Sequence, residues 1–263
     1  MRDRVEALLK GAFDFRIHTG PEPDGERRTD YLEAGRDSYE AEMAGFVLMK
    51  HRHPTALAAY ALNRMYPGFH AVGSIVLNTS VGGLNPDAVE AAAKLGAKVV
   101  WMPTQDAATI RLLDASNDLE AVLDVAKSYG MAVASTHATF ADTEMLVRLA
   151  GSVGLERLVV TNPTARFGEE GASKLLSHDL YVELPFLSYY DGQDAGDRLR
   201  GVIESVGADR CVVSTDFGQW TNPPPAEGMR MAIAAMLDAG MHEADIAKVV
   251  RTNPLDCVGL SAD

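Results

Sequence analysis

The chain has 263 residues, a length that fits one barrel of eight strand–helix units, which needs roughly 250 residues. Hydrophobic residues make up 47% of the sequence and charged residues 23%, which excludes a disordered chain. The formal net charge of -13 excludes a surface that attracts nucleic acid, and the longest apolar runs are too short to span a membrane. We therefore expect one domain over residues 1–263, with neither a nucleic acid nor a membrane as its partner.

Short apolar runs alternate with longer helical patterns along the whole chain. Runs of this kind, rich in β-branched residues, are typical of parallel strands that are buried on both faces. Eight of them predict strands, which begin at residues 12, 45, 70, 98, 132, 157, 180 and 210.

The segments between these runs have helical patterns with recognisable ends. Residues 1–13 carry charges among their apolar residues, so they predict a short amphipathic helix rather than a signal peptide, and we expect a cytoplasmic protein. The clearest further helices are predicted at residues 86–97, 117–131, 141–154, 194–208, 225–240 and 243–254. The alternation predicts an α/β fold, and eight units favour a closed (β/α)8 TIM barrel over the alternative of an open, doubly wound sheet.

Polar side chains gather at the ends of the predicted strands. Asp14, Arg16 and His18 end the first strand with a spacing of two residues, which predicts that all three share one face. Later strands end in further polar residues, namely Lys50, His51, His53, His137, Asn162, Glu183 and Asp216. In a parallel barrel, polar groups at the C-terminal strand ends are typical of a catalytic site. We expect His18, His137 and Asp216 to meet at one mouth of the barrel.

Two other features bear on this site. Residues 19–29 follow the first strand and are rich in proline, glycine and charge, so they predict a loop that partly covers the mouth. The two cysteines, Cys211 and Cys257, form no CxxC pair, and we expect both to be reduced and without a functional role.

Three stretches carry a resemblance to a known family: residues 70–104, 214–228 and 246–260, the last with Asn253-Pro254 in an I-x-K-x-x-x-x-N-P pattern. On these residues the chain resembles the amidohydrolase-like metal-dependent hydrolases, in a branch of unknown function. The resemblance extends from about Phe13 to Leu260. It implies a TIM barrel with metal ligands at the ends of its strands.

The resemblance also implies which residues would hold a metal. His18 matches the second histidine of the family's first-strand His-x-His, His137 matches the fifth-strand histidine, and Asp216 matches the final aspartate. Two positions depart from the family, because Arg16 replaces the first histidine and Asn162 replaces the sixth-strand histidine. Two alternatives stay open: a zinc or manganese ion held by His18, His137 and Asp216, or no metal, since arginine is not a ligand and asparagine is a weak one.

Three hypotheses for the function follow. The leading one is a hydrolase that acts on an amide, ester or phosphoester of a small polar molecule through a metal-bound water, with Asp216 as general base. The alternative is a metal-independent lactonase, lyase or isomerase, in which Arg16 supplies the positive charge of the metal and His137 or Asp216 moves a proton. The third is a non-catalytic pseudoenzyme that retains the pocket.

The candidate residues divide by role. We expect Asp216, His137 and Arg16 to be catalytic, and the candidates for substrate binding are Arg16, Lys50, His51, His53, Asn162 and Glu183. Whether His51 or His53 matches a family position stays open. Because the first and eighth strands adjoin in a closed barrel, we expect Arg16 and Asp216 to form an ion pair with parallel N–H donors in the place of a metal. The expected partner is a small molecule, and the chain is either a monomer or a homo-oligomer.

Overall fold

Eight parallel strands form one sheet in which strands that follow one another in the sequence are neighbours in space. The structure is a computed structural model and describes residues 1–261. The strands are β1 (Phe13–His18), β2 (Gly45–Met49), β3 (His70–Val76), β4 (Ala97–Trp101), β5 (Ala132–Ala134), β6 (Leu158–Thr161), β7 (Tyr181–Pro185) and β8 (Cys211–Ser214). Each begins within one residue of a predicted run, so the eight strands and the TIM barrel are confirmed.

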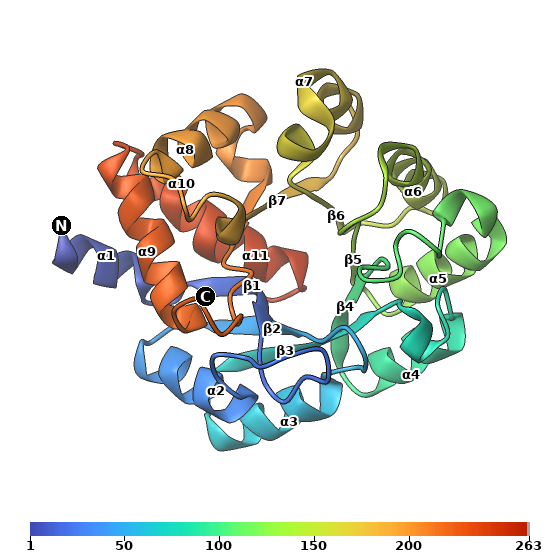
Figure 1. Ribbon diagram of the computed structural model, residues 1–263, viewed down its shortest axis with the longest axis horizontal. Coiled ribbons are helices and arrows are strands. Elements are labelled where there is room, and N and C mark those ends of the chain that lie inside the picture. Colours follow the sequence, from blue (N-terminus) through green and yellow to red (C-terminus); the bar gives the residue numbers. More distant parts are fainter. Residues whose placement is uncertain (262–263) are drawn as a thin grey trace.

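Helices surround the ring of strands, as Figure 1 shows in a view down the barrel. They are α1 (Arg2–Leu9), α2 (Tyr31–Glu40), α3 (Ala56–Met65), α4 (Pro86–Lys94), α5 (Ser116–Ser128), α6 (Phe140–Val153), α7 (Pro163–Leu176), α8 (Ala195–Val206), α9 (Pro225–Asp238), α10 (Glu243–Ala247) and α11 (Asn253–Cys257).

The last predicted helix, at 243–254, is helical throughout, but a π-helical turn (Lys248–Thr252) lies between α10 and α11. The π-helical turn ends shortly before Pro254, which has no N–H to donate to the regular helical ladder. The side chain of Asn253 instead donates from Nδ2 to the carbonyl oxygens of Ala208 and Cys211, at 2.7 and 2.6 Å.

The barrel is closed between β1 and the residues that follow β8. The amide of Asp216 donates to the carbonyl oxygen of Arg16 at 3.0 Å, and the amide of His18 donates to the carbonyl oxygen of Phe217 at 2.8 Å. The C-terminal ends of the first and last strands therefore meet at one seam.

A β-bulge in β1 changes which way its side chains face. Asp14 pairs with Phe46 and Ile17 pairs with Leu48, so Phe15 and Arg16 together lie opposite a single residue of β2. Phe46, Leu48 and Ile17 pack against α2 and α3 on the outside of the barrel, whereas Phe15 belongs to the interior cluster. The expectation that Asp14, Arg16 and His18 share a face was wrong, because the extra residue leaves Asp14 facing outwards while Arg16 lies inside over the ring of Trp101.

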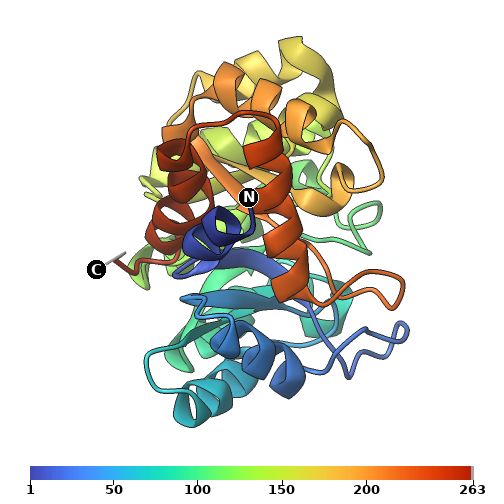
Figure 2. The same ribbon diagram turned by 90° about the vertical axis from the view of Figure 1, so that its left-hand side faces the viewer.

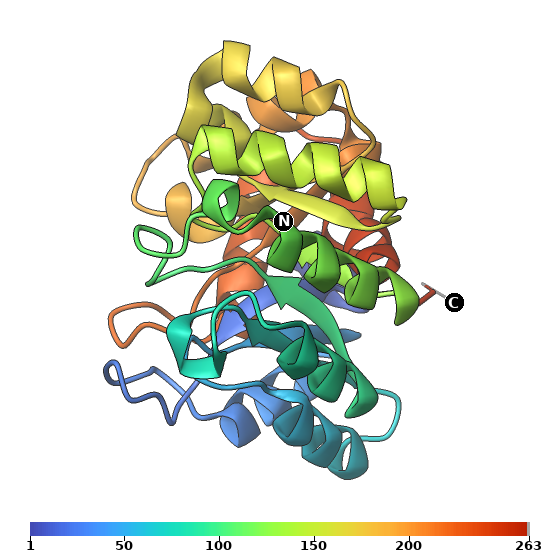
Figure 3. The ribbon, with the colours of Figure 1, turned by 90° about the vertical axis from the view of Figure 1, so that its right-hand side faces the viewer.

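The two ends of the barrel differ. At the N-terminal end of the strands, Leu255, Cys257 and Val258 pack into the interior cluster with Phe13, so α11 closes this end. The loops that follow the strands gather at the other end, on the right of Figure 2 and the left of Figure 3. Within residues 1–261 no helix is long and apolar enough to cross a membrane.

Candidate active site at the mouth of the barrel

Arg16 is the centre of the polar groups inside the barrel. Its side chain is 3% exposed, and Nε and Nη2 donate to the two carboxylate oxygens of Glu183 at 2.8 and 2.6 Å. Asp216 is a more distant partner, with Oδ1 3.7 Å from Nε. The predicted proximity of Arg16 and Asp216 is therefore present, but the parallel pair of donors binds Glu183 instead. The third guanidinium nitrogen, Nη1, donates to no residue within 1–261 and is not sealed by its surroundings.

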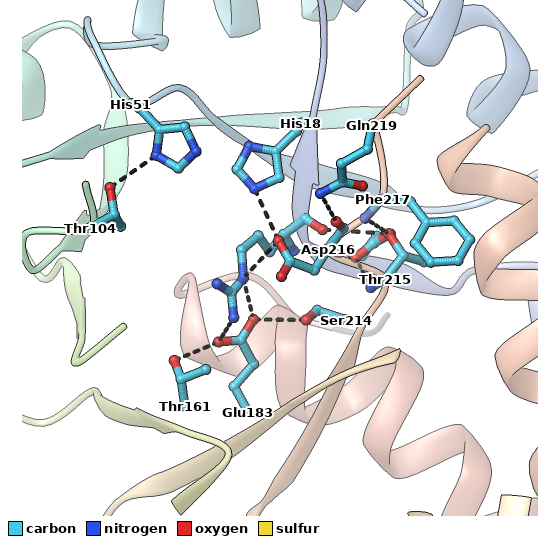
Figure 4. Close-up of polar contacts among 12 residues, drawn as sticks. His18, His51, Thr104, Thr161, Glu183, Ser214, Thr215, Asp216, Phe217 and Gln219 are labelled. Atoms are coloured by element: carbon cyan, nitrogen blue, oxygen red, sulfur yellow. Dashed lines mark hydrogen bonds and ion pairs between the residues drawn. The ribbon is translucent and has the colours of Figure 1, made fainter. Parts of the chain in front are cut away.

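Glu183 holds Arg16 in place rather than facing the mouth. Its side chain is fully buried, and each of its oxygens accepts a second hydrogen bond, from Ser214 Oγ at 2.7 Å and from Thr161 Oγ1 at 2.9 Å. These contacts are drawn in Figure 4. A carboxylate that already accepts four hydrogen bonds has little capacity left for a substrate.

Asp216 and His18 form a hydrogen-bonded pair above Arg16. Asp216 Oδ1 lies 2.9 Å from His18 Nε2 (Figure 4). Burial opposes the charge of Asp216, but Arg16 and His18 outweigh burial and lower its pKa to about 2. The carboxylate is therefore ionised at neutral pH and accepts the proton on Nε2. Its second oxygen, Oδ2, remains open to the mouth, since no hydrogen bond joins it to the described residues and it is not sealed.

His51 lies beside His18. The two rings stack with centroids 5.0 Å apart, and His51 Nδ1 lies 2.9 Å from Thr104 Oγ1. Because Asn78 Nδ2 already donates to this hydroxyl oxygen, the Thr104 hydroxyl is free to donate to Nδ1 and leave the proton of His51 on Nε2. Burial, together with the neighbouring His18 and Arg27, lowers the pKa of His51 to about 3. His51 is thus a neutral donor.

His137 and Arg166 lie near enough to the site to interact electrostatically with Arg16. His137 is exposed and makes no hydrogen bond within residues 1–261, and partial desolvation of its ring, together with Arg16 and Arg166, lowers its pKa. Arg166, on α7, donates from its guanidinium to the carbonyl oxygens of Thr136 and Ala138. Arg166 was not among the residues predicted from the sequence. The available signal was its position one turn into the helix that follows the Thr-Asn-Pro strand end.

The remaining candidates have other surroundings. Lys50 Nζ donates to the carbonyl oxygens of Thr19 and Pro21, so it holds the loop of residues 19–29. His53 is exposed, and its Nδ1 contacts the carbonyl oxygen of Pro54. Asn162 is buried at the end of β6, where Oδ1 accepts a hydrogen bond from Tyr189 at 3.0 Å.

Backbone strain is concentrated at the strand ends. Thr136, Asn162 and Asp216, which follow β5, β6 and β8, have φ values of 46°, 45° and 57°. Residues other than glycine rarely adopt this left-handed backbone conformation, and such strain is common at active sites. Three strand ends therefore share the same costly backbone conformation.

The loop of residues 19–29 is fastened along one side of the mouth. Arg27 pairs with Gln219 of the loop after β8, and the Arg28 amide donates to the carbonyl oxygen of Gly218 at 2.8 Å. Several buried polar atoms of this region have no hydrogen-bond partner, namely His18 Nδ1, Thr19 Oγ1, both oxygens of Glu22, Arg27 Nε and Thr29 Oγ1. Buried polar atoms normally have a hydrogen-bond partner, so these unpaired donors and acceptors are available to bind water or a ligand.

The donor set does not fit the metal site implied by the resemblance. Within residues 1–261 no group of three or more His, Cys, Asp or Glu side chains is arranged to hold a metal ion. A buried guanidinium lies 3.7 Å from Asp216, where it places a positive charge beside the carboxylate that the family uses as a ligand. A second cation at this position would be repelled by Arg16.

Comparison with known proteins identifies the family. Residues 11–183, well over half of the chain, match the model of a family of unknown function, DUF6282. The chain belongs to this family. No curated protein matches the sequence of this DUF6282 member.

Solved structures show the fold in more detail. An amidohydrolase from Pseudomonas aeruginosa is similar over 97% of this chain and 99% of its own, with a TM-score of 0.71 and 14% identity. A D-hydantoinase is similar over 94% of this chain and 70% of its own, with a TM-score of 0.64 and 14% identity. An amidohydrolase from Burkholderia multivorans, solved with bound zinc, covers 95% of this chain and 99% of its own, with a TM-score of 0.64 and 10% identity. These likenesses confirm the expected TIM-barrel fold.

Proposed function

We propose that this DUF6282 member is a hydrolase that acts on a small polar ester, lactone, amide or phosphoester at the mouth of the barrel, without a catalytic metal. The observation that carries the proposal is the buried guanidinium of Arg16 beside Asp216. It supplies a fixed positive charge at the strand ends, as the metal does in hydrolases of this fold. The fold of the structural neighbours supports a hydrolase over other barrel enzymes.

The open polar atoms suggest how the reaction would proceed. Arg16 Nη1 would donate to the substrate oxygen on which negative charge develops, and the neutral His51 ring would supply a second donor through Nε2–H. Asp216 Oδ2 would hold the attacking water as a hydrogen-bond acceptor. A carboxylate with a pKa of about 2 is a weak base at neutral pH, so His137 is the better group to take the proton of the water and return it to the leaving group.

A hydrolysis screen tests this proposal. Protein dialysed against EDTA, with its metal content measured, would be assayed for proton release from panels of lactones, carboxylic esters, amides and phosphoesters. We expect turnover of at least one class in the absence of metal, and a loss of about 100-fold or more in kcat for Asp216→Asn and for His137→Gln. His178→Gln is the matched control, because His178 is exposed and precedes the N-terminal end of β7, away from the C-terminal strand ends.

Three outcomes would contradict the proposal. Turnover of no class argues for the non-catalytic alternative. Turnover that appears only when zinc or manganese is added back argues for the metal-bound water. Equal activity of His137→Gln and His178→Gln removes His137 from the reaction.

A further inference from the structure

Asp14 is a buried carboxylate that the mechanism above does not use. Its side chain is 1% exposed and faces away from the barrel interior, since it pairs with the outward-facing Phe46. It therefore cannot touch a substrate bound at the mouth. Its oxygens nevertheless accept hydrogen bonds from both sides of the seam that closes the barrel.

On the β1 side, Asp14 stabilises the bulge. Oδ1 accepts the amide of Arg16 at 3.2 Å, a bond from a side chain to the backbone two residues later that draws the chain into a local turn. In a regular strand, residues two apart face the same way, so Arg16 would point outwards with Asp14. The extra residue of the bulge turns Arg16 into the barrel instead.

On the β8 side, the same carboxylate fixes the residue before Asp216. Oδ1 accepts the amide of Thr215 at 2.9 Å and Oδ2 accepts its hydroxyl at 2.5 Å (Figure 4 shows Thr215 beside Asp216). Asp216 then has a left-handed φ of 57°, and its amide donates to the carbonyl oxygen of Arg16. One side chain thus constrains the backbone at both members of the Arg16–Asp216 pair.

We propose that Asp14 is a positioning residue that sets the distance and orientation between Arg16 and Asp216, and through Asp216 the hydrogen bond to His18. Its catalytic consequence rests on the proposed function, but the geometry does not, and the experiment below reads the geometry first. Burial raises the pKa of Asp14 to about 7, so an asparagine, which keeps the acceptor oxygen, is the conservative replacement.

The test measures the state of the His18 ring by ¹⁵N NMR of the imidazole. In the wild-type protein the proton of His18 is expected on Nε2, because the ionised Asp216 accepts it. Asp14→Ala should loosen the contact between β1 and the residues that follow β8. The ¹⁵N chemical shifts of the two ring nitrogens should then move towards values averaged over the two tautomers, whereas Asp14→Asn should keep the wild-type chemical shifts. If turnover has been found, Asp14→Ala should also lower kcat by about 100-fold with a smaller change in KM, as expected for a misplaced reacting group.

Asp142 provides the matched control. It is also a buried aspartate, 2% exposed, and it accepts a threonine hydroxyl and a backbone amide, from Thr139 and Leu113, but at the start of α6. Asp142→Ala should lower the free energy of unfolding and leave the His18 shifts unchanged. Should Asp14→Ala fail to fold, Thr215→Val removes one of the three hydrogen bonds and should shift the His18 signals in the same direction by less.

The outcomes separate this inference from the proposed function. Unchanged His18 shifts in Asp14→Ala, or in Thr215→Val when Asp14→Ala does not fold, overturn the positioning role. The positioning role is also overturned if Asp142→Ala or Asp14→Asn changes the His18 chemical shifts as much as Asp14→Ala does. Absence of turnover bears only on the hydrolase.

Discussion

Arg16 and Glu183 meet inside the barrel from strands that are not neighbours, because β8 lies between β1 and β7. Two hydrogen bonds of 2.8 and 2.6 Å join them, and both side chains are almost fully sealed from solvent. The charge of Arg16 is therefore balanced by its close partner Glu183, and Asp216 is a second, more distant carboxylate partner. Its position does not depend on a substrate.

Removing Arg16 should destabilise the protein strongly. Arg16→Ala leaves Glu183 buried without its cation, and breaking such a pair typically costs about 3–5 kcal/mol in the free energy of unfolding. Urea unfolding followed by circular dichroism measures this. Arg4→Ala is the control, because its pair with Glu243 is half exposed and should contribute less than about 1 kcal/mol. Equal effects of the two substitutions would show that the buried pair contributes little.

His51 should stay neutral over the physiological range. Its pKa is lowered to about 3 in the fold, chiefly by burial, so its ¹⁵N resonances should not titrate between pH 5 and 8. The folded pKa lies below the unfolded value, so this histidine contributes stability that is present above about pH 6.5 and is lost as the pH falls towards 3. His51→Asn should therefore reduce the acid sensitivity of unfolding between these limits. A His51 resonance that titrates near pH 6.5 would contradict the assignment.

Lys50 should control the mobility of the loop of residues 19–29. Its ammonium donates to two carbonyl oxygens of this loop, so Lys50→Met should free the loop while the aliphatic stem still packs. Limited proteolysis should then cut within residues 19–29 several times faster than in the wild type. Lys127→Met, which removes a comparable bond to the carbonyl oxygen of Val153 on the barrel exterior, should leave this cleavage rate unchanged.

The two cysteines should be dispensable for activity. Cys211 lies on β8 and packs against the surrounding helices, and Cys257 packs into the barrel interior at the end opposite the mouth. Burial raises the pKa of each thiol. Thiol titration of the native protein should give no rapid reaction, and the Cys211→Ala, Cys257→Ala double variant should keep kcat/KM within about twofold. A large loss of turnover with normal stability would assign one of them a role.

Sequence patterns were sufficient for the barrel because most strands are predominantly apolar runs that lie between helices with clear ends. They were insufficient for the inside of the barrel. The bulge at Phe15 and Arg16 is accompanied by a hydrogen bond from a backbone amide to a side chain, and neither leaves a trace in the spacing of apolar residues. For the same reason the true partner of Arg16 was not foreseen, since Glu183 is 167 residues away and is selected by three-dimensional proximity.

Of the candidate site residues, those that follow strands directly were the easiest to place. His18 and Asp216 lie together because both end strands at the seam. His53 stays a prediction: it lies two positions after His51, and its side chain is exposed. Arg166 was missed because it lies on a helix, where polar residues usually face solvent.

The closure of one end of the barrel by α11 has a kinetic consequence. Leu255 and Cys257 fill the interior at the N-terminal ends of the strands, so a molecule that reaches Arg16 must enter and depart through a single opening. Product and fresh substrate then compete for the same passage. Product accumulating in an assay should accordingly act as a competitive inhibitor, and the residues that line the opening should influence release as much as capture.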